Sequence, residues 1–178
     1  MNTAALEKSD PAAARSSGRI SSEKAGAPAP QIHIKNILVP VDFSELSLKS
    51  LQYAVPLAQQ YGAKLTVLYV VEPLAYAPEL PYGVPFPPDP EAGVRKELEE
   101  LCKTRIPAGV PVDLAIREDF APSGVVEAAR SLCADLIVTT THGRTGIQHL
   151  FMGSTVEKIV QRAPCPVLVL NEREQEFV

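Results

Sequence analysis

Residues 34–71 have the sequence IKNILVPVDFSELSLKSLQYAVPLAQQYGAKLTVLYVV. The run around Ile37 and the run at 64–71 are apolar and rich in β-branched residues, as in strands buried on both faces of a sheet. Between them apolar residues recur at helical spacing. Ser44 can cap the start of that helix, and Gly62 stands where a left-handed residue ends one. The stretch therefore predicts a strand, a helix and a second, parallel strand, which form one crossover unit.

The rest of the chain repeats this alternation. Strands are predicted at residues 112–117, 135–140 and 166–170, and helices at residues 91–104, 123–132 and 154–162. Strands that alternate with helices form a parallel sheet that is covered by helices on both faces. We therefore expect an α/β fold, a doubly wound five-stranded parallel sheet in the order 3-2-1-4-5.

The composition indicates an ordinary globular domain, since the 178 residues are 46% hydrophobic and carry a formal net charge of −4. The sequence has no Lys/Arg-rich run and no apolar run of about 20 residues, so neither nucleic acid nor a membrane is expected as a partner. Its three cysteines lack the C-x-x-C spacing of a zinc site or redox centre. Their odd number favours the reducing cytoplasm over a disulfide framework.

Three segments lie outside the predicted sheet and helices. Residues 1–31 are rich in Ala, Ser, Pro and Gly, and they predict a disordered tail before a domain at 32–171 and a C-terminal tail at 172–178. Residues 72–91 hold seven prolines, which exclude regular structure over about twenty positions. This loop leaves the carboxyl end of a strand, so it is either a variable surface insertion or a lid over a bound ligand.

Two segments are expected to meet at the carboxyl edge of the sheet, where ligands of doubly wound folds bind. Asp42 follows the first strand, and it suits either a ribose hydroxyl or the positive start of the next helix. Residues 141–160 contain glycines and the capping-box sequence STVE at 154–157, whose open amides form an anion site. The alternative is that these glycines only turn the chain and that Ser154 only caps its helix.

The sequence resembles the universal stress protein family in two segments, KNILVPVDFSELSLKSLQYAVPLAQQYGAKLTVLYVVEP at 35–73 and DLIVTTTHGRTGIQHLFMGSTVEKIVQRAPCPVLVL at 135–170. The resemblance extends over about residues 33–171. It implies a fold of five parallel strands, usually in a homodimer joined through the last strand. Some members of the family bind ATP and others do not.

The family's nucleotide-binding pattern is a glycine, two residues, a second glycine, nine residues and then Gly-Ser or Gly-Thr. Gly143 matches the second glycine and Gly153-Ser154 the final pair, whereas Thr140 replaces the first glycine. Mg²⁺ bound with the nucleotide is the metal expected in the alternative of slow ATP hydrolysis. The sequence indicates neither a catalytic residue nor a protein ligand for a metal. The resemblance assigns Pro40, Val41, Asp42, Gly143, Gly153 and Ser154 to nucleotide binding, with Thr140 in the place of the first glycine and Val70 or Val71 at the adenine edge. Arg144 in the same loop and Thr155 at the helix start are further candidate phosphate contacts.

The sequence is compatible with three functions. The first is an ATP-binding regulatory homodimer of the stress response, joined through residues 166–170. The second is a slow Mg²⁺-dependent ATPase that uses the same pocket, and the third is a protein-interaction module that binds no nucleotide. The sequence has no P-loop and no hydrolase motif, so rapid catalysis is not expected. We favour the regulatory homodimer.

Overall fold

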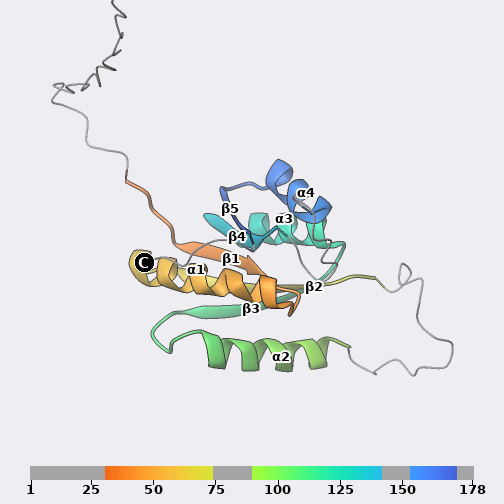
Figure 1. Cartoon of the computed structure of the whole chain (residues 1–178), viewed down its shortest axis with the longest axis horizontal. Coiled ribbons are helices and arrows are strands. Elements are labelled where there is room, and N and C mark those ends of the chain that lie inside the picture. Colours follow the sequence, from red (N-terminus) through yellow and green to blue (C-terminus); the bar gives the residue numbers. More distant parts are fainter. Residues whose placement is uncertain (1–30, 74–89, 142–152, 172–178) are drawn as a thin grey trace, which may run out of the picture. The chain divides into compact units, whose positions relative to one another are not determined.

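The computed structural model describes residues 31–73, 90–141 and 153–171, which form one parallel five-stranded sheet with helices (Figure 1). The strand order is β3-β2-β1-β4-β5, which confirms the predicted doubly wound α/β fold. The strands are β1 (Asn36–Pro40), β2 (Lys64–Val71), β3 (Val112–Glu118), β4 (Leu136–Thr140) and β5 (Val167–Leu170). The helices are α1 (Glu45–Tyr61), α2 (Pro90–Arg105), α3 (Ala121–Ser131) and α4 (Ser154–Arg162).

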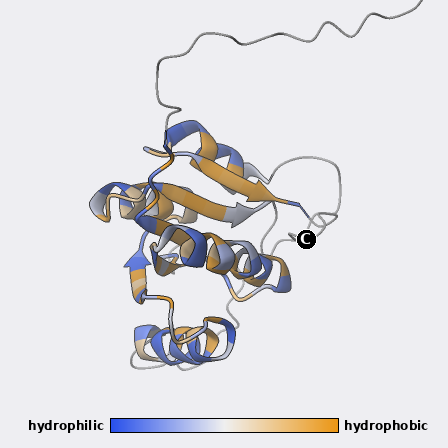
Figure 2. Cartoon of the chain, turned by 90° about the vertical axis from the view of Figure 1, so that its left-hand side faces the viewer, coloured by the Kyte–Doolittle hydropathy of each residue, from blue (hydrophilic) through white to orange (hydrophobic). Residues whose placement is uncertain are grey.

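The core consists of two apolar clusters, one on each face of the sheet. Ile37 and Val39 of β1 belong to the cluster that packs under α1 and α2. Leu38, between them in sequence, belongs to the cluster that packs under α3 and α4. This alternation of a strand's side chains between two covered faces explains why strands such as β1 and β4 are almost continuously apolar. Strands coloured orange for hydrophobic residues are visible in Figure 2.

Helix α1 begins and ends where the sequence predicts. The Ser44 hydroxyl accepts a hydrogen bond from the Ser47 amide at 3.1 Å, which satisfies one of the open donors of the first turn. Gly62 has φ 63° and ψ 33°, the left-handed conformation that glycine adopts without a steric cost. The helix continues through Pro56, where proline supplies no amide donor.

Helix α2 covers the same face as α1 and buries Leu98 and Cys102. Burial raises the pKa of the Cys102 thiol, because a thiolate loses its hydration there. Cys102 is therefore a neutral packing residue of the core.

Helix α3 begins at Ala121, two residues before the predicted start at Ser123. Pro122 suits the first turn of a helix, where no intrahelical partner is needed for its missing amide. The Glu72 carboxylate, at the end of β2, accepts a hydrogen bond from the Ala121 amide at 3.1 Å. A side chain distant in sequence thus caps α3, which local sequence signals do not reveal.

The predicted tails at 1–31 and 172–178 lie outside the described residues, apart from Gln31, and so does most of the Pro-rich loop at 72–91. Within the described ranges no helix is long and apolar enough to cross a membrane.

Asp135 fixes the amino end of the sheet. Its Oδ2 atom accepts hydrogen bonds from the amides of Lys35 at 2.8 Å and Asn36 at 2.9 Å, so one carboxylate holds the start of β1 beside the start of β4. Asp113, by contrast, makes an exposed ion pair with Lys64 across β2 and β3. These two acids allow a matched comparison.

We expect Asp135→Ala to lower the free energy of unfolding by about 1–3 kcal/mol, because two amides lose a charged acceptor. Asp113→Ala is expected to cost less than about 1 kcal/mol, as exposed ion pairs contribute little. Urea denaturation of both variants and of the wild type measures the difference. Equal losses in the two variants would show that the Asp135 hydrogen bonds contribute no more than a surface ion pair.

Candidate functional site

The candidate site lies at the carboxyl edge of β1 and β4, where the topology reverses. The chain leaves β1 towards β2 and β3 on one side of the sheet, and it returns to β4 and β5 on the other. Loops that leave two such adjacent strands diverge to opposite faces, which opens a crevice between them. Asp42 follows β1 at this edge, and Thr141 follows β4.

Asp42 is held in a hydrogen-bonded turn. Its Oδ1 atom accepts from the Ser44 amide at 3.0 Å and from the Ser44 hydroxyl at 2.6 Å. The Asp42 amide donates to the Ser47 hydroxyl at 3.2 Å. The structure thus confirms the expected role of Asp42 at the start of α1, and it places the residue at the end of β1, where the expected ribose contact would be made. A carboxylate accepts about four hydrogen bonds, so the role in the turn is compatible with a ligand hydroxyl.

Phe43, next to Asp42, is a site feature that sequence reasoning missed. Its φ is 61°, a left-handed conformation that bulky residues rarely adopt. The ring stacks on Tyr69 of β2 with 5.0 Å between centroids, and this contact holds the strained turn in place. The stack connects the turn that carries Asp42 to the end of the neighbouring strand. An aromatic residue gives no sequence signal for a left-handed backbone.

The predicted capping role of Ser154 is wrong. Gly153 is the N-cap residue of α4, and Ser154 is the first residue within the helix and is exposed. The Gly153 amide donates to the Thr141 carbonyl at 3.0 Å, and a Cβ at Gly153 would lie 2.8 Å from that oxygen. The close approach of α4 to the end of β4 therefore excludes a side chain at the cap.

A glycine cap leaves the start of α4 without a capping side chain. The amides of Ser154 and Thr155 precede the first intrahelical bond, from the Glu157 amide to the Gly153 carbonyl at 3.0 Å. Within the described residues nothing accepts from these two amides. Such a helix start carries a partial positive charge and open donors, and both favour an anion.

Thr140 is the last residue of β4 and is buried. Its position is extended, as the left-handed non-glycine residues of the described chain are Phe43 and Cys133. Directly after β1, Val41 is also buried in the core, and its amide donates to the Leu68 carbonyl at 2.8 Å. Pro40, half-buried at the end of β1, pairs with Leu68 in the sheet register. These residues lie at the carboxyl ends of β1 and β4, next to the candidate site.

The backbone and the side chain of Val70 face different surroundings. The Leu68 carbonyl accepts a hydrogen bond from the Val41 amide, on the side of β2 that faces β1. Peptide groups alternate in direction along a strand, so the N–H and C=O of Val70, two residues later, point to the same side. β1 has ended at that point, so these groups lie beyond it. The side chain packs against Gly124 of α3, where an added Cβ would lie 2.9 Å from Cγ1 of Val70. A ligand in the crevice would therefore meet the backbone of Val70.

Gly143 and Arg144 lie outside the described residues, so their predicted phosphate contacts remain predictions. Across the described ranges, no cluster of three or more His, Cys, Asp or Glu side chains is arranged to hold a metal ion. The described site thus combines one carboxylate at the end of β1, polar backbone at β2 and open amides at α4. Doubly wound α/β proteins bind their ligands at this place in the fold, so these groups form the candidate site.

The pattern of the universal stress protein family matches residues 33–171. A universal stress protein of Methanocaldococcus jannaschii is 31% identical over 145 residues, which cover 80% of this chain and 85% of that relative. The chain belongs to the universal stress protein family.

Two solved structures share the fold and were determined with nucleotides. A universal stress protein in complex with cAMP has a TM-score of 0.57 and 20% identity, covering 78% of this chain and 98% of its own. The universal stress protein of Archaeoglobus fulgidus in complex with dAMP has a TM-score of 0.53 and 18% identity, with the same coverage of 78% and 98%.

Proposed function

We propose that this protein is an ATP-binding regulatory homodimer of the cytoplasmic stress response. The observation that carries the proposal is the position of Asp42 and of the open amides of α4, which follow the adjacent strands β1 and β4. A carboxylate accepts hydrogen bonds from ribose hydroxyls, and a helix start binds phosphate. The complexes of two fold neighbours with cAMP and dAMP support an adenine nucleotide as the ligand.

In this proposal each part of the nucleotide has its own partner. The adenine edge bonds to the backbone of Val70, and the ribose bonds to Asp42. The triphosphate lies along the amides of Ser154 and Thr155, with Gly143 and Arg144 completing its contacts. Mg²⁺ would be held by the phosphate oxygens, and it would supply the neutralisation of charge that polyphosphates need.

The ligand can be identified without choosing it in advance. The protein is purified under native conditions and then denatured, and the released small molecules are identified by mass spectrometry. We expect ATP or its products in an amount approaching one per chain. Incubation with Mg²⁺ and ATP then separates a binder from the slow ATPase, which would release phosphate steadily over many turnovers.

Thr140→Gly tests the residue that departs from the family pattern. We expect the affinity for ATP to change by less than about tenfold, because Thr140 is extended and buried within β4 and not in a turn that requires glycine. Calorimetric titration of both proteins measures the change. If the wild type binds no ATP and the glycine variant does, the native pocket is vestigial and the interaction module is the better account.

The proposed dimer uses the free edge of the sheet. In the described chain β5 pairs only with β4, through the carbonyls of Pro166 and Leu170. The peptide groups of Val167 and Val169 alternate with these and face outwards. A second copy of β5 can pair with them antiparallel about a two-fold axis, and this contact would cover an edge that otherwise invites aggregation.

A further inference from the structure

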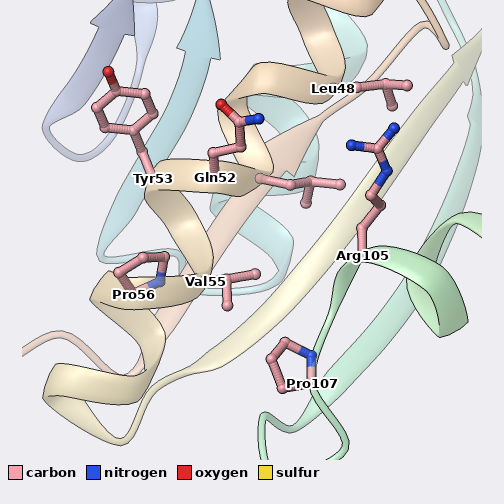
Figure 3. Close-up of a pocket in the computed structure, with 8 residues that line it drawn as sticks. Leu48, Gln52, Tyr53, Val55, Pro56, Arg105 and Pro107 are labelled. Carbon is pink, nitrogen blue, oxygen red and sulfur yellow. The ribbon is translucent and has the colours of Figure 1, made fainter. Parts of the chain in front are cut away.

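A groove separates α1 from the end of α2 on the face of the sheet that both helices cover (Figure 3). It has a volume of about 360 Å³, and a second hollow of about 340 Å³ continues it along the outer side of α1. The lining is mainly apolar and includes Leu48, Leu51, Val55, Pro56 and Pro107. It has room for an aromatic or branched side chain. Among the described residues that line the two hollows, the only carboxylate is that of Glu45, in the second hollow.

One cation lines both hollows of the groove. Arg105, in the last turn of α2, extends towards Leu48 and lines both hollows. Among the described residues it forms no ion pair, whereas Arg130 pairs with Glu127 along α3. An apolar floor beside such a guanidinium group fits a peptide that combines acidic and large apolar side chains.

The chain leaves β5 beside this groove. The ammonium group of Lys49, which lines the second hollow, donates to the carbonyl of Asn171 at 3.4 Å. The described residues end at Asn171, directly after β5. The next seven residues therefore start from the rim of the groove.

Residues 172–178 combine acidic and large apolar side chains, the composition expected for a peptide in this groove. Their sequence is EREQEFV, in which three glutamates outnumber one arginine and are followed by Phe177 and Val178. An extended chain of seven residues spans about 23 Å, more than the diameter of one helix with its side chains, about 10–12 Å. The segment is thus long enough to cross α1 from the rim to Arg105.

We propose that residues 172–178 dock into the groove of their own chain. Phe177 enters the apolar part between α1 and α2, and the glutamates lie along Arg105 and Lys49. Docking would tie the strand at the proposed dimer edge to α1, whose first turn begins at the Asp42–Ser44 hydrogen bonds. The segment would then connect the free edge of the sheet with the candidate nucleotide site, although the docking itself does not depend on nucleotide binding.

A single tryptophan reports on this docking, because the chain contains none. In the full-length Phe177→Trp protein we expect emission at a shorter wavelength than in denaturant and quenching by acrylamide that is several-fold weaker. Adding Arg105→Glu should move both readings towards their denatured values. Adding Glu174→Lys and Glu176→Lys as well should restore them, since the exchanged charges attract again. Arg95→Glu, an exposed cation of α2 that does not line the groove, is the matched control and should change neither reading.

Three results would overturn the proposal. The first is a tryptophan that emits and is quenched as in denaturant while the protein remains folded by circular dichroism. The second is a shielded tryptophan that Arg105→Glu leaves unchanged, which would place the segment elsewhere. The third is shielding that disappears on dilution as the dimer dissociates, which would assign the groove to the segment of a second copy.

Discussion

Asp42→Asn is expected to weaken ATP binding by about 10- to 100-fold, because a hydrogen bond to a charged acceptor contributes about 1.5–3 kcal/mol. The amide side chain keeps an oxygen in place of Oδ1, which accepts from Ser44 in the wild type. The fold of α1 is therefore expected to tolerate the change. Calorimetric titration with ATP measures the affinity, and thermal denaturation shows whether the variant keeps its stability.

Asp119→Asn is the matched control for this prediction. Asp119 also follows a strand at the carboxyl edge, and its Oδ1 accepts from the next amide, of Phe120, at 2.7 Å. It follows β3, however, which lies at the far edge of the sheet from the crevice between β1 and β4. We expect unchanged ATP affinity in this variant. The ribose assignment fails if both variants bind as the wild type does, or if both lose affinity equally.

Val169→Glu is expected to convert the proposed dimer to a monomer. Antiparallel pairing brings two copies of β5 together about the two-fold axis, so the substitution places two carboxylates near each other in the interface. Val169 is half-buried and belongs to neither core cluster, in contrast to Leu170, so the monomer should remain folded. Light scattering measures the mass of both proteins at a concentration on the order of tens of micromolar, because the fraction of dimer depends on protein concentration.

Val112→Glu is the control for the dimer prediction. Val112 begins β3, the strand at the opposite edge of the sheet, and it is 36% exposed. We expect this variant to remain dimeric. A wild type that is already monomeric would end the proposal for β5, and a dimer that survives Val169→Glu would place the interface elsewhere.

Most of the fold could be predicted from the sequence because its signals are local and repeated. The apolar strands, the cap at Ser44 and the left-handed Gly62 each follow from the residue types in a short window. The strand order then follows from topological rules on crossover connections and from the expected switch point. Differences at element ends, such as the earlier start of α3 at Ala121, arise where a distant side chain, Glu72, supplies the cap.

The site was less predictable because its details depend on close packing between distant segments. Ser154 has the residue type of an N-cap, but the approach of α4 to the Thr141 carbonyl leaves room only for Gly153. Phe43 adopts a left-handed backbone in the turn after β1, and its ring stacks on Tyr69 of β2. Tertiary contacts of this kind override local propensity.

The packing of Gly153 also changes how the phosphate site should be tested. A valine there would collide with the Thr141 carbonyl and disturb the junction of β4 and α4, so lost binding would not report on phosphate contacts. Asp42→Asn avoids this difficulty because it changes the charge of the site and leaves its shape.

The central claim is that the crevice between β1 and β4 binds ATP. Calorimetric titration of the full-length wild-type chain with Mg²⁺ and ATP, after removal of any nucleotide that co-purifies, tests this claim most directly. The account predicts saturable binding of one ATP per chain, weakened by Asp42→Asn and unaffected by Asp119→Asn. The absence of saturable binding, together with no adenine nucleotide in the natively purified protein, would contradict it.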